Sequence, residues 1–438
     1  MSIDSPHQHT KAFAGTRNTS QTGIPSNSSQ NALHLLSKKL LPGAVMLWVV
    51  AGGFVIFEPS PYELMFLVVL PLAFFAGMNI HRRALGLFKL MVFFLPFSII
   101  GAFQVKIADF STSLTFSIVT VFLWFTGYFA ANYIAENPHK RLGDMIRAYT
   151  WVAVFISIVG TLAYLDVIPG SEVFLLYDRV KATFQDPNVF GPFLIVPAAF
   201  ALQRALMDTG KRAFWGGVVY GILFVGVFVS FSRAAWGYII LTSAIVFVAC
   251  FLLEASARDR ARMIAITVAG IFALLIALVA LLSIDSVAEL FLQRFSLEQN
   301  YDSGTSGRFG RQAYAMELAL SNPLGIGPLE FRNLRVTEDP HNTYVTVILS
   351  YGWLGGLAYI SMIWMTMKNG AGALLKASPN RLLMIPLMAN FIPLSIEAAI
   401  IDTDHWRHLF LLVGMIWGVY AGYGRTSPEQ MDKSKRLI

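Results

Sequence analysis

The chain is short of charge and has almost no cysteine. Only 13% of its 438 residues are Asp, Glu, Lys or Arg, whereas 55% are hydrophobic and the mean hydropathy is +0.59. This composition excludes a water-soluble globular protein and predicts a membrane protein with several spans. The single cysteine, Cys250, excludes an intrachain disulfide, so the cysteine count does not indicate a redox compartment.

No apolar run is present in the first 39 residues, which are rich in Ser, Asn, Gln and Thr. We therefore expect a disordered cytoplasmic tail at residues 1–39 and no signal peptide. Beyond this tail lie apolar segments close to the ~20 residues that cross a bilayer. Backbone groups in lipid must bond within their own segment, so the predicted fold is an all-α polytopic membrane protein of about twelve helices. The twelve segments are 40–57, 62–80, 84–103, 114–135, 148–168, 188–207, 213–231, 234–253, 263–283, 341–367, 382–400 and 408–424.

A long gap after the ninth segment divides the chain. Residues 40–283 hold nine predicted helices, 284–340 form a long loop with short helices, 341–424 hold three more helices, and 425–438 form a second tail. With a cytoplasmic N-terminus, the inner segments carry 22 Lys and Arg and the outer segments carry 10. The positive-inside rule then predicts that both termini are cytoplasmic and that the long loop lies outside.

The net charge of +7 does not indicate a nucleic-acid-binding surface, because the basic residues are spread over short inner loops beside lipid headgroups. The arginines of the long outer loop are different, since the positive-inside rule disfavours them there. They are Arg294, Arg308, Arg311, Arg332 and Arg335. An anionic ligand on the outer side would account for their presence.

Two parts of the long loop have a predictable structure. Residues 305–320 predict a helix, ended by an Asn-Pro pair, that places Arg308 and Arg311 on one face. An anion between the two arginines would offset their repulsion, whereas the alternative is a solvated surface helix. Residues 324–328 (LGIGP) are too apolar for a solvated linker and predict a tight turn against the helix bundle.

His341 follows Pro340 at the expected start of the tenth helix. In the first turn of a helix, the dipole disfavours an imidazolium, and a neutral imidazole can accept a proton. A hydroxyl that attacks a sugar carbon needs such a base within hydrogen-bond reach. The alternative is an interfacial histidine that bonds a neighbouring carbonyl.

Two more outer segments carry arginines. Residues 178–188 place Arg179 and Lys181 close to Asp186 and Asn188, a pattern typical of a helix start. Arg233 lies in a gap between apolar segments that is too short for its side chain to reach far into solvent. A diphosphate would suit the planar donors of such an arginine, and the alternative is snorkelling to lipid headgroups.

The last outer loop holds Asp402, Asp404 and His405 within a few residues. A metal site could be built from them, but their spacing matches no standard ligand motif, so we prefer a polar loop that caps the last helix. Glu397 lies just inside the membrane and is expected to line the same outer cavity. We predict no metal site and no cofactor.

Three motifs in a fixed order resemble the O-antigen ligase and O-antigen polymerase family of bacterial inner-membrane glycosyltransferases. They are SRAAW at 232–236, the segment 306–327 that begins SGR, and PHNTY at 340–344, which leads into YGWLG at 351–355. Residues 183–191 look like the variant found in the polysaccharide polymerases of this family.

The resemblance implies a metal-independent transfer on the periplasmic side of the inner membrane, from an undecaprenyl-diphosphate-linked glycan to a hydroxyl acceptor. By matching motif, Arg233, Arg308 and Arg311 would hold the diphosphate and stabilise the leaving group, and His341 would take the acceptor proton. Expected partners are that donor, an acceptor glycan or lipid A-core, membrane lipid, and chain-length regulator and export proteins, with no nucleic acid. Further candidates for substrate contacts are Arg179, Lys181, Asp186, Asn188, Asn342, Tyr344, Asp402, Asp404 and His405.

Alternatives for the function stay open at this point. A polymerase of O-antigen or exopolysaccharide repeat units would add the glycan to another lipid-linked repeat, whereas a ligase would add it to lipid A-core; residues 183–191 favour the polymerase. A polysaccharide transporter or flippase is disfavoured, because the longest loop follows the ninth helix and no internal repeat is visible.

Overall fold

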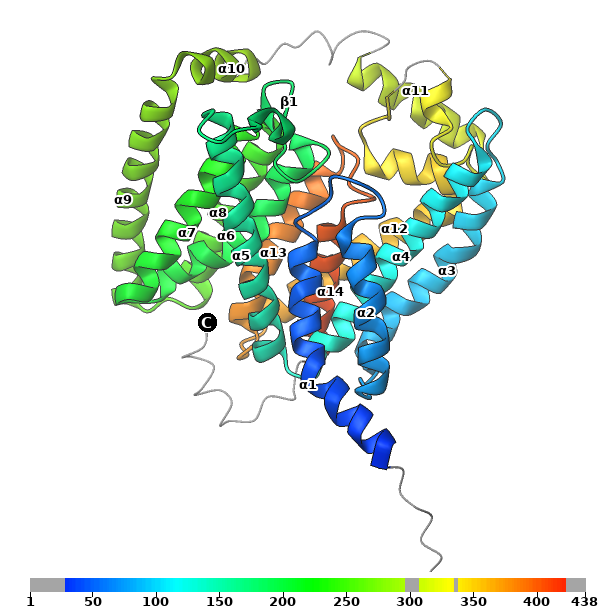
Figure 1. Ribbon diagram of the computed structural model, residues 1–438, viewed down its shortest axis with the longest axis horizontal. Helices are drawn as coiled ribbons and strands as arrows, with labels where there is room; N and C mark the ends of the chain where they lie inside the picture. The colour runs from blue at the N-terminus through cyan, green and yellow to red at the C-terminus, as the bar shows by residue number, and fades with distance from the viewer. Residues whose placement is uncertain (1–27, 296–306, 335–337, 423–438) are drawn as a thin grey trace, which may run out of the picture.

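The computed structural model describes residues 28–295, 307–334 and 338–422, and Figure 1 shows the arrangement of its helices. The predicted all-α membrane fold is confirmed. A two-residue antiparallel hairpin pairs β1 (Leu175–Leu176) with β2 (Arg179–Val180). Short 3-10 helices are η1 (Arg82–Ala84), η2 (Ser171–Phe174) and η3 (Phe331–Asn333). The α-helices are α1 (Ser28–Ala51), α2 (Pro61–Phe75), α3 (Leu85–Ala102), α4 (Phe110–Ala135), α5 (Pro138–Tyr164), α6 (Pro187–Met207), α7 (Gly210–Val229), α8 (Arg233–Leu253), α9 (Ala257–Leu282), α10 (Asp285–Phe295), α11 (Arg308–Ser321), α12 (Thr343–Leu375), α13 (Arg381–Glu397) and α14 (Arg407–Ala421).

Each of the twelve predicted apolar segments corresponds to a helix. In the part of the chain that the structure describes, nine helices are long and apolar enough to cross a membrane, namely α1, α3 to α9 and α12. Helices α2, α13 and α14 are shorter, with 15, 17 and 15 residues. Length and hydropathy therefore located these elements correctly, because both are local properties of the sequence.

The largest differences in helix starts are at α1 and α5, which begin well before their predicted starts at 40 and 148. Helix α1 starts at Ser28, inside the expected tail 1–39, because polar but helix-forming residues continue the apolar span toward the N-terminus. Helix α5 starts at Pro138 instead of 148, since the Asn137 side chain accepts a hydrogen bond from the Lys140 N–H and caps the first turn. The remainder of the predicted first tail, residues 1–27, and the predicted tail 425–438 lie outside the described residues.

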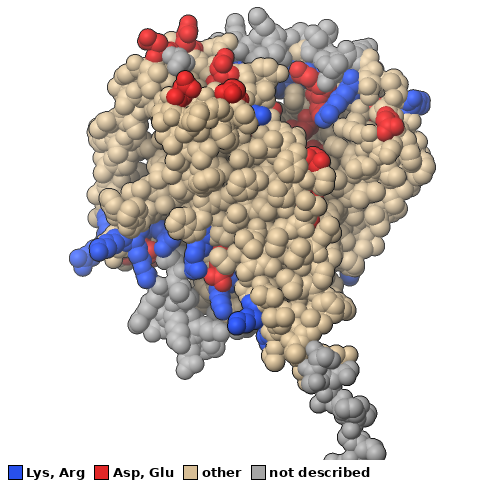
Figure 2. All heavy atoms as spheres, viewed as in Figure 1, with Lys and Arg blue, Asp and Glu red and all other residues tan. Residues whose placement is uncertain are grey.

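The two ends of the bundle differ in structure and charge. The loop end, at the top of Figure 1, carries the β1–β2 hairpin, α10 and α11. The opposite end, where α5, α7, α9 and α13 begin, is called the basic end here, because Lys and Arg gather along it in Figure 2. This asymmetry is the one that the positive-inside rule generates.

Helix α11 and the segment after it dock on the bundle at the loop end. Gly325 has φ +79°, and a Cβ atom there would lie 2.7 Å from the backbone nitrogen of Gly352, where α12 kinks at φ +73°. The Ile326 N–H donates to the Leu349 carbonyl at 2.8 Å, and the Trp353 N–H donates to the Pro323 carbonyl at 2.9 Å. Only glycine fits this left-handed, crowded position without strain. The predicted tight turn against the bundle is confirmed.

Candidate active site

A cavity of about 680 Å³ opens at the loop end, between α8, α11 and α13. Segments that are far apart in the sequence supply its lining, from the β1–β2 hairpin near residue 179 to the end of α13 near residue 400. Its basic residues are Arg179, Arg233, Arg294, Arg308, Arg311 and His341. Its carboxylates are Glu338 and Glu397.

Arg233 is the first residue of α8, and the local structure around it is tightly specified. The Ser232 side chain accepts a hydrogen bond from the Ala235 N–H and caps the helix, while Phe231 adopts a left-handed φ of 47°. The Trp236 indole donates to the Phe228 carbonyl at 3.1 Å and stacks on the Phe228 ring. The SRAAW motif therefore fixes the direction in which Arg233 leaves the backbone, toward the cavity.

Arg179 on β2 is only 8% exposed and joins three segments. Its Nε donates to the Ser230 carbonyl at 3.0 Å, and its Nη2 donates to the Asn188 side chain at 2.8 Å. Asp186 caps α6 through the Asn188 N–H at 2.6 Å. The hairpin, the start of α6 and the end of α7 are thus tied together at the cavity wall.

Helix α11 presents two arginines to the cavity. Arg308 and Arg311 both line it, as expected from their spacing on one helix face. Arg311 is 6% exposed and forms an ion pair with Glu338. That guanidinium holds the pKa of the Glu338 carboxyl below its ordinary value of 4.5. A buried arginine is costly unless it is paired, so Glu338 stabilises Arg311 in its place.

His341 does not belong to the helix in which it was predicted to lie. Helix α12 begins at Thr343, and its N-cap is Asn342, whose side chain accepts a hydrogen bond from the Val345 N–H at 3.2 Å. His341 precedes the cap with a left-handed φ of 56°, which a non-glycine residue rarely adopts. The prediction that its ring occupies the first helical turn is wrong. Asparagine is a strong N-cap, so α12 begins only after Asn342 and His341 stays outside the helix.

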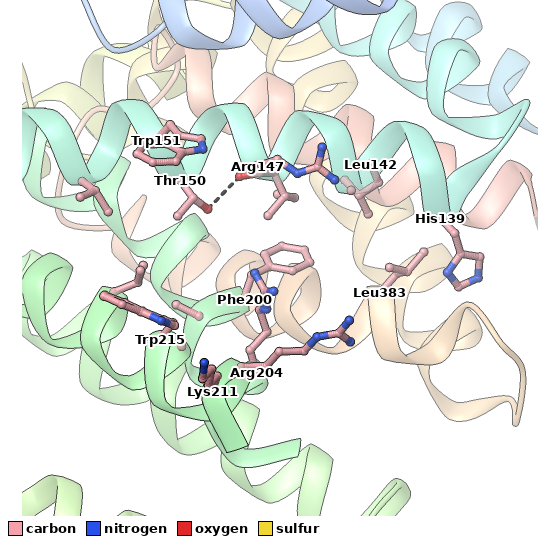
Figure 3. A pocket seen from close by; sticks show the side chains of 17 residues that line it. His139, Leu142, Arg147, Thr150, Trp151, Phe200, Arg204, Lys211, Trp215 and Leu383 are labelled. Atoms are coloured by element: carbon pink, nitrogen blue, oxygen red, sulfur yellow. Dashed lines mark hydrogen bonds between the residues drawn. The ribbon is translucent and has the colours of Figure 1, made fainter. Parts of the chain in front are cut away.

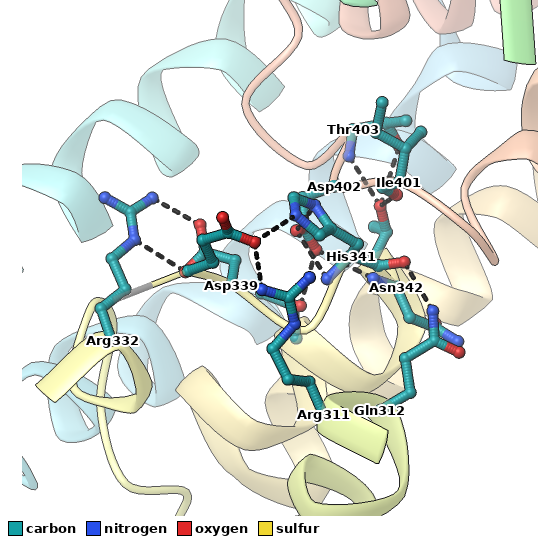
Figure 4. Close-up of polar contacts among 12 residues, drawn as sticks. Arg311, Gln312, Arg332, Asp339, His341, Asn342, Ile401, Asp402 and Thr403 are labelled. Carbon is teal, nitrogen blue, oxygen red and sulfur yellow. Dashed lines mark hydrogen bonds and ion pairs between the residues drawn. The ribbon is translucent and has the colours of Figure 1, made fainter. Parts of the chain in front are cut away.

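Asp402 holds His341 in this uncommon conformation, as Figure 4 shows. Its carboxylate accepts hydrogen bonds from the His341 N–H at 3.0 Å and from the Thr346 hydroxyl at 2.7 Å. The same carboxylate lies 3.4 Å from His341 Nδ1. On the other side of the ring, Nε2 lies 3.7 Å from Glu338. The imidazole is therefore held between two carboxylates, the partly buried Asp402 of the last loop and Glu338 at the cavity.

Residue Gln312 and an outer ion pair complete the support of this loop. The Gln312 side-chain amide donates to the His341 carbonyl at 2.9 Å, which connects α11 directly to the histidine. Arg332 binds Asp339 through two hydrogen bonds of 2.7 and 2.5 Å (Figure 4). These contacts fix the loop on both sides of Pro340 and favour a single orientation of the histidine.

Glu397 supplies the second carboxylate of the cavity. It is 4% exposed, and among the described residues neither of its carboxylate oxygens has a hydrogen-bond partner. Among the described lining residues there are five arginines and two carboxylates, so cationic side chains outnumber acidic ones. Such a concentration of cationic side chains in one cavity attracts a multiply charged anion.

The structure brings some of the predicted site residues together and places others elsewhere. Arg179, Asn188, Arg233, Arg308, Arg311 and His341 line the cavity. Asp402 lies behind His341, and Tyr344 donates its hydroxyl to the Ser395 carbonyl at 2.6 Å. The other predicted site residues are absent from the described part of the cavity lining. They are Lys181, Asp186, Asn342, Tyr344, Asp402, Asp404 and His405.

His405 and Asp404 serve the packing of the last loop. His405 Nδ1 lies 3.2 Å from the Asp404 carboxylate, and its Nε2 lies 3.1 Å from the Thr120 hydroxyl. Its ring packs on Phe116 with 3.6 Å between ring centroids. His405 is therefore engaged with α4 and with Asp404. The predicted capping of the last helix by a polar side chain is not found, because the N-cap of α14 is Trp406, which makes no side-chain capping hydrogen bond.

Two cavity residues had no role assigned from the sequence alone. Arg294 was noted only as one of the outer arginines, and Glu338 was not considered at all. The position of Glu338, two residues before Pro340, was the available signal. A carboxylate so close to a candidate base indicates a role at the site, but no sequence pattern predicts that Glu338 pairs with Arg311 across the loop.

The fold and the cavity define a class of protein, namely a multi-pass membrane protein with a deep cationic site and a fixed histidine at one end of the bundle. Residues 194–360 match the family model described as O-Antigen ligase. This match confirms the resemblance to the O-antigen ligase and polymerase family over that segment, and the activity associated with the family is glycosyl transfer. The matched segment includes Arg233, Arg308, Arg311 and His341 and ends before Glu397 and Asp402. No curated protein matches the chain.

Proposed function

We propose that this protein transfers a glycan from an undecaprenyl-diphosphate-linked donor to a hydroxyl acceptor, without a metal ion, and that it polymerises repeat units of an O-antigen or exopolysaccharide. The observation that carries the proposal is the convergence of Arg233, Arg308 and Arg311 on one cavity beside His341. We place this cavity on the periplasmic side of the bacterial inner membrane, with both termini in the cytoplasm. The concentration of basic residues at the opposite end supports that orientation.

The arginines are proposed to bind the diphosphate of the donor. Planar guanidinium groups donate in pairs to phosphate oxygens, and such charge-assisted hydrogen bonds are stronger than those between neutral groups. Arg233 at the start of α8 and Arg308 at the start of α11 both line the cavity. Arg311 would exchange its contact with Glu338 for a contact with the diphosphate.

His341 is proposed to act as the base of the transfer. With a proton on Nδ1 directed at Asp402, Nε2 accepts the proton of the acceptor hydroxyl. The hydroxyl oxygen forms a bond to the anomeric carbon of the donor, and the bond from that carbon to the phosphate oxygen breaks. Undecaprenyl diphosphate leaves with the electron pair, and the arginines stabilise the charge that develops on it.

Glu397 is proposed to contact the sugars. Its two oxygens would accept hydrogen bonds from hydroxyl groups of a glycan bound in the same cavity. A carboxylate without a protein partner is costly when buried, and hydroxyl donors of a bound glycan would offset that cost.

Transfer to lipid A-core is the second candidate, because the matching family model is described as a ligase. The two activities use the same donor and differ in the acceptor. Reconstituted protein in liposomes should be given lipid-linked repeat units with and without lipid A-core. Growth of glycan chains without core is the expected result and identifies a polymerase. Transfer only in the presence of core identifies a ligase. Release of intact donor on the other side of the liposome, with no new glycosidic bond, would indicate a transporter.

A further inference from the structure

A second cavity lies at the basic end of the bundle, far from the candidate active site, and has no part in the proposed transfer. Its volume is about 500 Å³. The walls come from α5 and α7, with the last turns of α6 and the start of α13 behind them, as Figure 3 shows. Its possible ligand is independent of the function proposed above.

The cavity exists because α5 and α7 converge at one end and separate toward the other. Near the loop end, the Ser157 hydroxyl donates to the Ile222 carbonyl at 2.9 Å, so the two helices touch. Toward the basic end they diverge, and the gap between residues 139–154 of α5 and 211–219 of α7 is not filled by protein. Both helices are long and apolar enough to cross a membrane, so the gap is open to lipid.

The walls of this cavity suit a hydrocarbon chain. Two large aromatic side chains, Trp151 from α5 and Trp215 from α7, line it from opposite sides, and they are 72% and 61% exposed. Phe200, Val154 and Val219 complete the apolar surface. Exposed tryptophans that face each other across a gap between helices indicate an apolar occupant that reaches in from the bilayer.

The mouth of the cavity suits a phosphate. Arg147, Arg204, Lys211 and Arg212 line it, and all four are exposed or largely exposed at the basic end. Arg147 lies 3.3 Å from Asp144, and Arg204 lies 4.0 Å from Asp208. Two carboxylates therefore stand against four cations, and burial raises the pKa of Asp208. Positive charge remains in excess where the apolar walls meet the membrane surface.

We propose that this cavity binds an acidic phospholipid, with its phosphate on the cations of the mouth and one acyl chain along Trp151 and Trp215. Basic pockets between membrane helices on the side that carries the positive loops are suited to such headgroups, and the nearby Lys and Arg residues attract an anionic lipid. A free phosphate ion would satisfy only the mouth, and a neutral phospholipid would satisfy only the walls. The combination selects a lipid with a net negative headgroup.

A substitution inside the cavity tests the site without removing a charge. A Cβ atom at Gly143, which lines the cavity, would meet no heavy atom within 4 Å, so Gly143→Leu fills space and also favours the helix. The matched control is Gly217→Leu on α7, where a Cβ atom also meets nothing within 4 Å and which is absent from the described lining. Both variants are expected to fold, because the added Cβ atom meets no neighbouring atom at either position and leucine favours the helix.

A second pair of variants tests the charge. Lys211→Gln with Arg212→Gln removes two cations of the mouth. Arg258→Gln with Lys376→Gln removes two exposed cations from the same end of the bundle but outside the described lining. The two doubles change the net charge equally, so a general attraction to acidic membranes affects them alike.

Native mass spectrometry should be performed on the full chain released from nanodiscs that contain equal amounts of phosphatidylglycerol and phosphatidylcholine. Wild-type protein and both controls are expected to retain phosphatidylglycerol preferentially. The Lys211→Gln, Arg212→Gln double should lose at least about tenfold of that retention, as the loss of two charges predicts, and Gly143→Leu should lose most of it because the side chain occupies the cavity. Equal retention by Gly143→Leu and Gly217→Leu, equal retention by the two charge doubles, or preferential retention of phosphatidylcholine would overturn the proposal. Displacement of the retained lipid by inorganic phosphate alone would show an ion site and would also overturn it.

Discussion

The carboxylate of Asp402 binds the backbone N–H of His341 at 3.0 Å and lies 3.4 Å from Nδ1 of the same residue. One side chain therefore fixes both the left-handed backbone and the ring of the proposed base. The two residues are 61 positions apart and come together only because the loop before α14 folds over the start of α12. This contact makes Asp402 a positioning residue that acts through His341.

Replacement of His341 by alanine should abolish most of the transfer. Loss of a general base costs about 10²- to 10⁴-fold in rate, whereas the arginines that bind the donor are unchanged. Single-turnover assays with labelled donor in liposomes would measure the chemical step, and a filter-binding assay would measure donor affinity. His34→Ala, an exposed histidine on α1, is the matched control. Turnover of the His341 variant close to that of the control would refute its role as the base.

Asp402→Asn should lower kcat while the donor KM stays constant. An amide keeps the size of the side chain but no longer orients a protonated Nδ1 with a full charge, and a displacement of about 1 Å in a reacting group costs roughly 100-fold. The second readout is a double variant. With His341→Ala already present, Asp402→Asn should have no further effect on the rate. An additional loss in that background would mean that Asp402 acts independently of the histidine.

Arg308→Ala should weaken the use of donor far more than Arg332→Ala. Hydrogen bonds to charged groups contribute about 1.5–3 kcal/mol, which corresponds to roughly 10- to 100-fold in kcat/KM. Arg332 belongs to the same long loop but binds Asp339 and is absent from the described cavity lining. Steady-state kinetics at several donor concentrations would separate the two. Similar losses in both variants would indicate that general loop charge, and not the cavity, binds the donor.

The ion pair between Arg311 and Glu338 should make the docking of α11 sensitive to acid. The pKa of the Glu338 carboxyl in the folded state lies below its ordinary value of 4.5. The carboxylate therefore contributes stability that is complete above pH 4.5 and is lost as the pH falls through the lower folded-state pKa. Thermal unfolding between about pH 3 and pH 7 should show a smaller acid-induced decrease for Glu338→Gln than for wild type.

Glu317→Gln provides the control for this pH dependence, because Glu317 is exposed on the same helix and forms no ion pair among the described residues. Its acid profile should follow that of wild type. If Glu338→Gln also follows wild type, then the ion pair does not contribute to folding in that pH range.

Gly325→Ala should destabilise the loop end of the bundle. A Cβ atom at φ +79° would lie 2.7 Å from both the Gly352 nitrogen and the Leu349 carbonyl oxygen, so strain and a steric clash add to more than about 1 kcal/mol. Gly372→Ala in α12 is the control, since a Cβ atom there meets no heavy atom within 4 Å and alanine favours the helix. Thermal unfolding would compare them, and a Gly325 variant as stable as the Gly372 variant would contradict the tight packing of residues 323–327 on α12.

Local properties of the sequence determined the class of fold and the position of its helices. Hydropathy located every apolar segment, because the requirement to satisfy backbone hydrogen bonds in lipid acts on each segment separately. Three further features could be predicted from the sequence, because capping, helical spacing and backbone freedom depend on near neighbours. They are the motif around Arg233, the shared face of Arg308 and Arg311, and the glycines at 325 and 327.

The tertiary structure decided which polar side chains meet. It moved His341 out of the helix, paired it with Asp402, placed Glu338 against Arg311, and assigned His405 to the packing on α4. Each of these outcomes depends on contacts between segments that are distant along the chain. Short-range sequence patterns do not encode such contacts, because a charged side chain in a loop has the same local signature whether it faces solvent, a cavity or another charge.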